Sequence, residues 1–380
     1  MRSPRLVLLP AGPMAGASSD PSPAARAGTA TSGGARTRST RGRAASRPAR
    51  SRRRTPDAPL PGIVEQLERI ERDGGDGIVV FERGVTLPVS SLDRLVWKRE
   101  RITKGALMRY YAQVAPMLLP SIKDRPLTLE RWPAGITGTS FYQHDPGESV
   151  PPAVRVAEVM TDAGAVPRFI GGDIVTLLYT IQLGAVSVDA WHSRLRSVDA
   201  PDWAVLDLDP GPRVPFSRIC TVALHVGEAL DALGLRCALK TSGSRGMHLV
   251  VPLPPRTTYE TAAALAEDVA QRVAAEHPEL ATIARAVDAR PKGTVYVDHL
   301  QNARGKTIAA AFSARARQGA LVSAPITWAE VEAGVDPRDF TVGTVPELAA
   351  RLRRTWETPL RAGNPGAAVR AAIRDGRRTV

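Results

Sequence analysis

Strand-like segments that alternate with amphipathic helices constrain the fold of this 380-residue chain most strongly. Helical apolar spacing marks two helices, at about Phe216–Leu233 and Thr258–His277. Such alternation favours an α/β or α+β sandwich with a mixed central sheet. The strand-like segments around these helices are Trp203–Asp209, Ala238–Ser242, Met247–Pro252 and Thr294–Leu300.

Shorter elements are predicted upstream of this region. Thr103 is suited to cap a helix at Lys104–Leu118, which Pro120 is expected to end. A short apolar helix-like turn is expected at Leu92–Trp97. The remaining expected elements are a helical run at Ile63–Ile70, strands at Gly77–Glu82, Gly84–Pro88, Pro126–Arg131 and Ser140–His144, and a helix at Asp173–Leu183.

Residues 1–58 are predicted to form a disordered, Arg-rich tail. They hold 12 Arg and no Lys, opposed only by Asp20 and Asp57, so most of the chain's net charge of +13 lies here. Large apolar residues are almost absent after Met14, so little burial offsets the entropy of ordering. Arg-rich arms attract nucleic-acid phosphates, although a solvated spacer would have the same composition. A catalytic domain is expected at 59–346, and a helical or flexible extension at 347–380.

Composition excludes several other classes. No apolar run approaches the roughly 18 residues of a membrane span. The apolar run at Leu6–Leu9 is ended by Pro10 and is too short for a signal peptide. Cys220 and Cys237 form no CxxC pair, so neither a structural zinc site nor a disulfide framework is indicated. We therefore expect a cytoplasmic protein without membrane contact.

Three aspartates at strand ends are the candidate catalytic and metal-binding residues. Side chains alternate along a strand, so Asp207 and Asp209 project to the same face. Asp298 ends another strand, and three converging carboxylates would suit two divalent cations. Taken alone, these residues also fit solvent-facing strand ends, and Asp-x-Asp occurs in nucleotide-sugar glycosyltransferases. An aspartyl-phosphate phosphatase is disfavoured, because such enzymes have Thr or Val two residues after the second Asp, and Gly211 occupies that position here.

The segment Lys240–His248 is the candidate phosphate-binding turn. Its two glycines bracket a tight turn whose backbone N–H groups suit an anion. No GKS/T or GxGxxG pattern is present. A hairpin with an incidental histidine remains the alternative. The side chains expected to bind a triphosphate are Lys240, Ser242, Arg245 and His248.

Taken together, these segments resemble the polymerase domain of bacterial ATP-dependent ligase D, a member of the archaeo-eukaryotic primase superfamily. The likeness extends from about Ile78 to about Pro346, with the motifs in the family's order. The motifs are ITKGALMRYYAQVAPMLLP at Ile102–Pro120, RPLTLERWPAG at Arg125–Gly135, FYQH at Phe141–His144, LDLDPGP at Leu206–Pro212, KTSGSRGMH at Lys240–His248 and VDHLQNARGKTIAAAFSARAR at Val297–Arg317.

The resemblance implies a primase-polymerase-like core with a mixed central sheet and a second, smaller sheet. It implies addition of nucleotides, often ribonucleotides, to DNA ends or gaps in non-homologous end joining, with two Mn²⁺ or Mg²⁺ ions and NTP or dNTP as substrate. The implied partners are DNA ends with a 5′-phosphate and the Ku protein. The chain lacks the KxDG signature of an adenylating ligase, so sealing would need a separate DNA ligase.

The resemblance also assigns roles by position. Asp207, Asp209 and Asp298 match the metal ligands. Arg94 and Lys104 match basic residues that grip a 5′-phosphate, and Phe141 and Tyr142 match aromatic positions that stack on a base. The matching nucleotide-binding positions are Lys240, Ser242, Arg245, His248, Gln301, Arg315 and Arg131.

Two positions depart from the family pattern. The family usually has a histidine where Asp189 stands, and a lysine where His144 stands. Either His192 substitutes for the missing histidine, or the extra acid alters nucleotide or metal binding. A catalytically impaired DNA-end-binding module of the same fold is therefore the main alternative, ahead of a glycosyltransferase.

Overall fold

The computed structural model describes residues 62–161 and 164–376, so the tail predicted for residues 1–58 lies outside the described residues. Eight α-helices occur in these ranges: α1 Ile63–Arg72, α2 Lys104–Ile122, α3 Ile174–Gln182, α4 Phe216–Ala232, α5 Tyr259–Glu276, α6 Trp328–Glu332, α7 Val345–Ala362 and α8 Gly366–Gly376.

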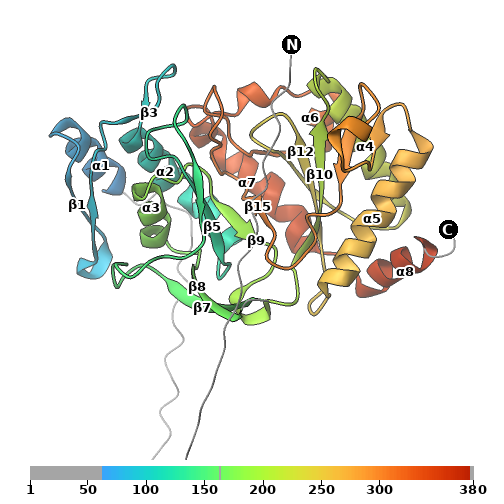
Figure 1. Cartoon of the computed structure of the whole chain (residues 1–380), viewed down its shortest axis with the longest axis horizontal. Helices are drawn as coiled ribbons and strands as arrows, with labels where there is room; N and C mark the ends of the chain where they lie inside the picture. Colours follow the sequence, from blue (N-terminus) through green and yellow to red (C-terminus); the bar gives the residue numbers. More distant parts are fainter. Residues whose placement is uncertain (1–61, 162–163, 377–380) are drawn as a thin grey trace, which may run out of the picture. The chain divides into compact units, whose positions relative to one another are not determined.

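The strands of the described residues are short and fall into several sheets (Figure 1). They are β1 Gly77–Val80, β2 Thr86–Val89, β3 Leu95–Trp97, β4 Ile102–Thr103, β5 Leu127–Arg131, β6 Phe141–Gln143, β7 Val156–Thr161, β8 Gly164–Phe169, β9 Asp189–Trp191, β10 Trp203–Pro210, β11 Ala238–Thr241, β12 Met247–Pro252, β13 Ala281–Thr282, β14 Val295–Asp298, β15 Thr307–Ala309 and β16 Pro325–Ile326.

The central sheet has six strands in the order β13-β14-β10-β12-β11-β16. The pairs β14–β10, β10–β12, β12–β11 and β11–β16 are antiparallel, whereas β13–β14 is parallel, so the sheet is mixed as predicted. Leu206 and Leu208 of β10 are fully buried on the face opposite the aspartates. Helices α4 and α5 pack against β10 (Figure 1).

The second sheet has four strands in the order β15-β9-β5-β6. One hydrophobic core cluster includes Leu127 and Ala190 of this sheet together with Val205 and Val250 of the central sheet. The structure thus confirms the predicted mixed α/β fold with a second, smaller sheet. The carboxylates lie on the central sheet, and the candidate aromatic residues lie on the smaller one.

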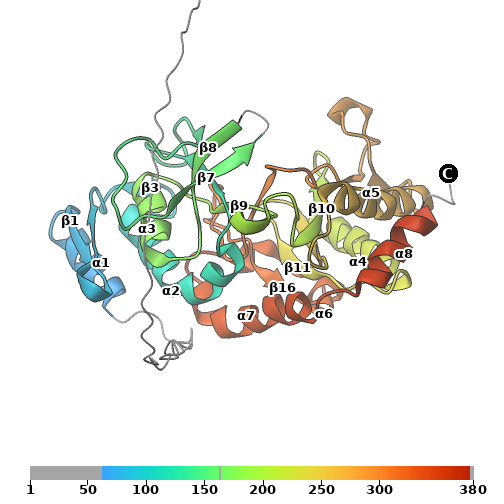
Figure 2. The same ribbon diagram turned by 90° about the horizontal axis from the view of Figure 1, so that it is seen from below.

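Helices and hairpins complete the two sheets. Helix α7 contacts β11, β12 and β16 and also reaches α2, as Figure 2 shows from below. The antiparallel β7–β8 hairpin lies away from α7 in the same view. Among the described residues, no helix is both long and apolar enough to cross a bilayer.

Two local predictions are wrong. Helix α2 continues past Pro120 to Ile122, because Leu118 and Ile122 on either side are buried and hold the chain helical. Their packing outweighs the loss of one backbone hydrogen bond per proline. Leu92–Trp97 ends in strand β3 rather than a helical turn, since Leu95 pairs with Thr103 of β4.

Candidate active site

Four ionisable side chains form one row across the central sheet. In the antiparallel register, Asp207 of β10 stands opposite Asp298 of β14 on one side and His248 of β12 on the other. His248 in turn stands opposite Lys240 of β11. Directly paired residues share a face, and adjacent strands lie about 4.8 Å apart. The row therefore runs from two carboxylates to an imidazole and an ammonium group.

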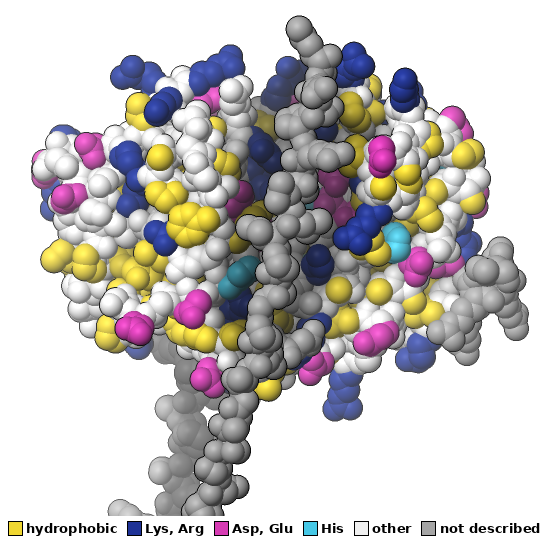
Figure 3. Space-filling view, in the orientation of Figure 1, with side chains coloured by type: hydrophobic (Ala, Val, Ile, Leu, Met, Phe, Trp, Pro, Cys, Tyr) yellow, Lys and Arg dark blue, Asp and Glu magenta, His cyan; other side chains and the backbone are white. Residues whose placement is uncertain are grey.

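Asp209 adds a third carboxylate to the same face. It lies two residues beyond Asp207 on β10 and opposite Tyr296 of β14. Figure 3 shows acidic side chains recessed in the middle of one face of the molecule, with Lys and Arg side chains on either side. The structure therefore brings the three predicted aspartates together, although Asp298 lies far from the other two in sequence.

The acidic end of the row has too little compensating charge. Burial, followed by the neighbouring Asp298 carboxylate, raises the pKa of Asp207 to about 7. The Asp209 side chain reaches solvent, yet partial burial and then the Asp207 charge raise its pKa to about 7 as well. Two such shifts on one strand mean that the folded chain favours a proton or a cation here.

One carboxylate oxygen lacks a partner. Asp207 Oδ1 is buried and accepts no hydrogen bond from the described residues. His248 Nε2 lies 3.3 Å from it without hydrogen-bond geometry. A buried carboxylate oxygen without a donor is costly, so this atom is suited to receive a cation.

Asp298 is instead held by its own loop. Its Oδ1 accepts hydrogen bonds from the Leu300 backbone N–H at 2.8 Å and the Tyr296 hydroxyl at 3.2 Å. Its Oδ2 accepts one from Gln301 Nε2 at 2.9 Å. Within 62–161 and 164–376, no group of three or more His, Cys, Asp or Glu side chains converges as a ready-made metal site. Asp298 Oδ2 accepts only one of these bonds, so it keeps a lone pair with which to share a cation with Asp207.

The basic end of the row is fully buried. Lys240 Nζ donates to Ser323 Oγ at 2.9 Å and to His248 Nδ1. Burial lowers the pKa of Lys240 to about 7 and holds that of His248 well below its usual value. His248 is therefore neutral, and its Nε2 faces Asp207.

The turn between β11 and β12 is tightly fastened. Ser242 Oγ accepts hydrogen bonds from the backbone N–H groups of Ser244 at 3.2 Å and Gly246 at 3.0 Å. Arg245 donates from Nη2 to the Pro210 carbonyl at 3.1 Å, beside the end of β10. Gly243 adopts a left-handed φ of +68°. The predicted phosphate-binding turn thus lies directly beyond the carboxylates.

Replacing Gly246 by Ala is expected to disturb this turn. A Cβ at Gly246 would lie 2.3 Å from the Leu208 carbonyl oxygen, which is backbone and must shift. We expect a loss of about 2 kcal/mol in unfolding free energy, typical of overpacking, and weaker nucleotide binding. Thermal melting and a nucleotide titration would measure both. Gly343→Ala is the control, because its Cβ would meet only Thr341 Oγ1 at 3.6 Å; equal melting temperatures for the two variants would contradict the prediction.

Asp189 and Arg315 form an ion pair next to the row. Arg315 Nη1 lies 3.6 Å from Asp189 Oδ1, and Ser187 Oγ donates to Asp189 Oδ2 at 2.5 Å. The Arg315 side chain also passes close to Gly243, since a Cβ added at Gly243 would lie 2.5 Å from Arg315 Cγ. The acid that departs from the family pattern therefore contacts a predicted nucleotide-binding arginine.

His192 does not take the place of the missing histidine. Its ring is fully buried, and neither ring nitrogen has a hydrogen-bond partner among the described residues. Burial, with Arg125 as the second cause, lowers its pKa to about 3. It packs as a neutral side chain, with its ring centroid 6.5 Å from that of Trp203.

The predicted DNA-binding residues form a second group. The Lys104 backbone N–H donates to the Arg94 carbonyl at 2.8 Å, so the two basic residues are neighbours across the turn between them. Lys104 is buried, and burial followed by Arg94 lowers its pKa to about 8. Arg94 Nε is buried without a partner among the described residues. Two neighbouring cations with an unsatisfied donor suit an anion.

The aromatic pair and Arg131 belong to the smaller sheet. Phe141 and Tyr142 of β6 are 47% and 66% exposed, unusual for large aromatic side chains. Arg131 of β5 stands opposite Phe141, with its Cζ 5.1 Å from the ring centroid, and donates from Nη1 to Gln143 at 2.8 Å. The structure groups Arg131 with Phe141 rather than with the turn at Ser242.

Three positioning residues were not singled out from the sequence. Asn302 bonds the Val205 backbone twice, accepting from N–H at 2.7 Å and donating to the carbonyl at 2.7 Å. Asn302 thus takes the place of a neighbouring strand at Val205, because β10 pairs with β14 only from Asp207 onward. Tyr296 shares its face with Asp298, a signal visible in the alternation, whereas Ser323 carries no sequence signal.

Metal-dependent stability should reveal the paired carboxylates. Because the pKa of Asp207 is raised in the folded chain, its contribution to the free energy of unfolding falls as the pH rises from about 4 to about 7. The lowered pKa of His192 acts in the opposite direction, so wild type must be compared with Asp207→Asn. We expect the melting temperature of wild type, relative to that variant, to fall from about pH 5 to about pH 8 without metal and to recover when Mn²⁺ is added. Parallel pH profiles would contradict this.

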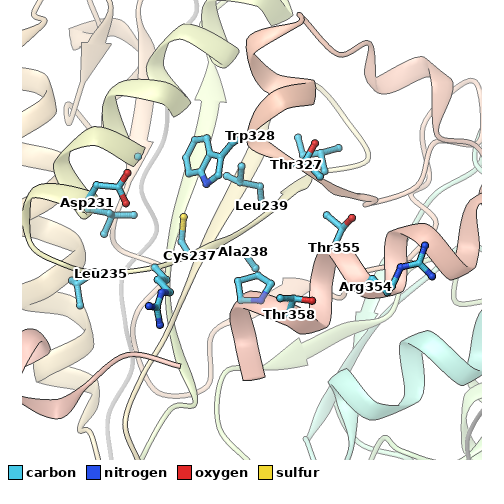
Figure 4. A pocket seen from close by; sticks show the side chains of 15 residues that line it. Asp231, Leu235, Cys237, Ala238, Leu239, Thr327, Trp328, Arg354, Thr355 and Thr358 are labelled. Atoms are coloured by element: carbon cyan, nitrogen blue, oxygen red, sulfur yellow. The ribbon is translucent and has the colours of Figure 1, made fainter. Parts of the chain in front are cut away.

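A separate cavity of about 410 Å³ lies away from the carboxylates. Figure 4 shows Trp328, Cys237 and Leu239 on one side and Thr355, Thr358 and Arg354 of α7 on the other. None of the predicted site residues lines it. The candidate chemistry is therefore placed at the carboxylate row, where three carboxylates lie on one sheet face and Asp207 Oδ1 is buried without a partner among the described residues.

Comparisons with known proteins identify the family of this chain. The profile of the LigD primase-polymerase domain family matches residues 103–356. The multifunctional non-homologous end joining protein LigD of Pseudomonas aeruginosa is 32% identical over 286 residues, covering 70% of this chain and 34% of that protein. The bifunctional LigD of Bacillus subtilis is 32% identical over 260 residues, covering 68% of this chain and 42% of that protein.

A solved structure shows the same fold. The polymerase domain of Mycobacterium tuberculosis ligase D in complex with DNA is similar with a TM-score of 0.64 and 31% identity, covering 70% of this chain and 94% of that chain. This chain spans only 34% and 42% of the length of the two LigD proteins above. With the family profile, the sequence identity and the fold in agreement, the chain belongs to the LigD primase-polymerase domain family.

Proposed function

We propose that this chain is a metal-dependent nucleotidyltransferase that adds nucleotides to DNA ends or gaps. The observation that carries the proposal is the row of Asp298, Asp207, His248 and Lys240 in register across four strands. It places carboxylates that would hold cations beside a basic, glycine-containing turn that would bind phosphates. The family assignment removes the support for a nucleotide-sugar glycosyltransferase.

The three carboxylates would hold two Mn²⁺ or Mg²⁺ ions, since hard cations prefer oxygen ligands. Bound there, the ions would lower the pKa of the attacking hydroxyl and neutralise charge on the departing pyrophosphate. The chain's own residues would do the rest. His248 and Arg245 would contact the phosphates, and Ser242 would keep the turn in place through its bonds to Ser244 and Gly246.

The second group of residues would bind the DNA. Exposed Phe141 and Tyr142 would stack on bases, which is tolerant of sequence. Arg94 and Lys104 would bind the 5′-phosphate of the end or gap. The relatives named for non-homologous end joining and the neighbour bound to DNA support this role. We further propose Ku and a separate DNA ligase as partners, and ribonucleotides as the preferred substrate.

One extension assay tests the proposal. Purified protein is incubated with a gapped, 5′-phosphorylated DNA, Mn²⁺ or Mg²⁺, and either NTPs or dNTPs. We expect primer extension that requires the metal and proceeds faster with NTPs. Absence of extension under all four conditions would reject the enzymatic function. Faster extension with dNTPs would reject only the ribonucleotide preference.

The second candidate is a DNA-end-binding module of the same fold with impaired catalysis. The Asp189–Arg315 ion pair favours it, because it engages a predicted nucleotide-binding arginine. The discriminating result is tight binding of 5′-phosphorylated ends without extension. Restored extension in Asp189→His would trace the impairment to this pair.

Lys104→Ala is expected to reduce the preference for 5′-phosphorylated ends by about tenfold. A charge-assisted bond to a phosphate contributes about 1.5–3 kcal/mol, and unphosphorylated ends do not use it. Anisotropy titrations with matched phosphorylated and unphosphorylated DNA measure the ratio. Lys98→Ala is the control, since Lys98 is exposed on the same segment. Equal losses on both DNAs would contradict a specific phosphate contact.

A further inference from the structure

A small basic pocket lies on the four-stranded sheet, apart from the carboxylate row. Its volume is about 190 Å³. It is enclosed by β5, β9, the β7–β8 hairpin, the residue after β6 and the loop before β15. Its lining residues are Thr128, His144, Thr161, Arg168, Trp191, Arg304 and Gly305.

Arg168 of β8 is the central group of this pocket. Its Nε and Nη1 atoms are buried and have no hydrogen-bond acceptor among the described residues. Burial lowers the pKa of Arg168 and the Asp145 carboxylate partly offsets this, but Asp145 makes no hydrogen bond to these two atoms, and arginine stays charged at neutral pH. Buried donors on a cation are costly when unsatisfied. A negatively charged hydrogen-bond acceptor, placed in the pocket, would satisfy these two donor atoms.

The neighbouring side chains suit an anion as well. Arg304 donates from Nη2 to the Met160 carbonyl at 2.7 Å and forms an ion pair with Asp199 at 2.8 Å. His144 Nδ1 lies 3.4 Å from Thr128 Oγ1. Burial and then Arg168 lower the pKa of His144, so the ring is neutral and its other nitrogen can donate or accept. Two guanidinium groups with hydroxyl and imidazole partners match a phosphate.

The position of the pocket relates it to the candidate active site. Thr128 stands opposite Asp189 in the β5–β9 register, so the two share a face. Trp191 lies two residues further along β9, roughly 7 Å beyond Asp189. Tyr142 stands opposite Glu130, two residues from Thr128 on the same face of β5. One sheet face thus carries the pocket, the exposed aromatic ring and the residue paired with Arg315.

We propose that the pocket around Arg168 binds a phosphate group, as a subsite for the substrate of the proposed nucleotidyltransferase, on which this inference rests. The phosphate belongs either to a nucleic-acid backbone or to a nucleotide. Both sources offer the same charged oxygens to Arg168 and Arg304. The pocket lies on the sheet face that carries Tyr142. A nucleic-acid strand with a base stacked on the Tyr142 ring would therefore pass along the pocket.

The test compares Arg168→Gln with wild type in two binding experiments. Fluorescence anisotropy with a labelled gapped duplex at several NaCl concentrations gives the slope of log affinity against log salt. Loss of one backbone contact reduces that slope by about one. A nucleotide source would instead leave the slope unchanged and raise the NTP dissociation constant about tenfold. Either result supports the phosphate site and identifies its source.

Two matched variants control the experiment. Arg272→Gln removes an arginine of α5 that pairs with Asp268 and lies outside the pocket, so its slope should equal that of wild type. Arg168→Lys keeps the charge and should retain most of the slope. Because Arg168 Nε and Nη1 have no partner among the described residues, Arg168→Gln is expected to fold, and thermal melting verifies this.

If Arg168→Gln is folded and changes neither the slope nor the NTP dissociation constant, the pocket binds no phosphate and the inference is overturned. An equal change of slope in Arg272→Gln would overturn it too. The outcome is separate from the extension assay. Wild type that binds DNA through Arg168 but extends no primer would reject the nucleotidyltransferase function and leave the phosphate site standing.

Discussion

Asp207→Asn is expected to lower the rate of nucleotide addition by at least about a thousandfold. Asp207 stands at the centre of the row, between Asp298 and His248, and its Oδ1 has no hydrogen-bond partner among the described residues. Asparagine keeps the shape but removes the charge that would hold a cation. Losing that contribution to the transition state costs about 4 kcal/mol, which corresponds to about a thousandfold.

Single-turnover extension with saturating Mn²⁺ measures this effect. The variant should fold at least as well as wild type without metal, because a buried and crowded negative charge is removed. Asp339→Asn changes an exposed aspartate outside the row and should leave the rate unchanged. Addition by folded Asp207→Asn within tenfold of wild type would disprove the role of Asp207.

Arg125→Met is expected to lower the free energy of unfolding by about 3 kcal/mol. Arg125 is fully buried and donates to the carbonyls of Ser121 at 2.8 Å, Trp191 at 3.2 Å and His192 at 2.6 Å. Its guanidinium also pairs with Asp202 and lies 3.7 Å from the centre of the Trp203 ring. Methionine would remove all of these donors. The His192 carbonyl would keep a hydrogen bond from the Asp202 backbone N–H at 2.9 Å, whereas each group left unpaired costs about 1–3 kcal/mol before relaxation.

Urea unfolding measures this loss against a matched variant. Arg194→Met removes a second arginine from the same carboxylate, since Arg194 Nε lies 2.7 Å from Asp202 Oδ2. Arg194 is 35% exposed, so its loss should cost only about 1 kcal/mol. A cost for Arg125→Met no larger than that for Arg194→Met would show that the buried contacts contribute little.

Most of the fold was predictable because local patterns and tertiary packing agree. The alternation in Trp203–Asp209 and Met247–Pro252 gave strands β10 and β12 within one residue, and both carry buried apolar residues on one face. Helix α2 extended beyond its prediction because the packing of Ile122 is non-local. Strand β3 was missed for a similar reason, since its pairing with β4 is not visible in its own residues.

For the candidate site, the sequence indicated which residues to consider but little of their mutual geometry. Alternation indicated that Asp207 and Asp209 share a face, but only the resemblance joined Asp298 to them. Its register opposite Asp207 depends on the packing of β14 against β10. The contact of Asp189 with Arg315 and the bond of Ser323 to Lys240 join segments distant in sequence. No local pattern carries such pairings.

Asp298 is the last residue of β14, and Asn302 fastens the loop that follows it. Ends of strands open more readily than their centres. Detachment of this short segment would separate the third carboxylate from the other two while Leu206 and Leu208 stayed packed beneath β10. Loss of the proposed cation-binding arrangement would therefore require far less energy than global unfolding. The Asn302 amide, which bonds only backbone groups among the described residues, would then set how long the three carboxylates stay together.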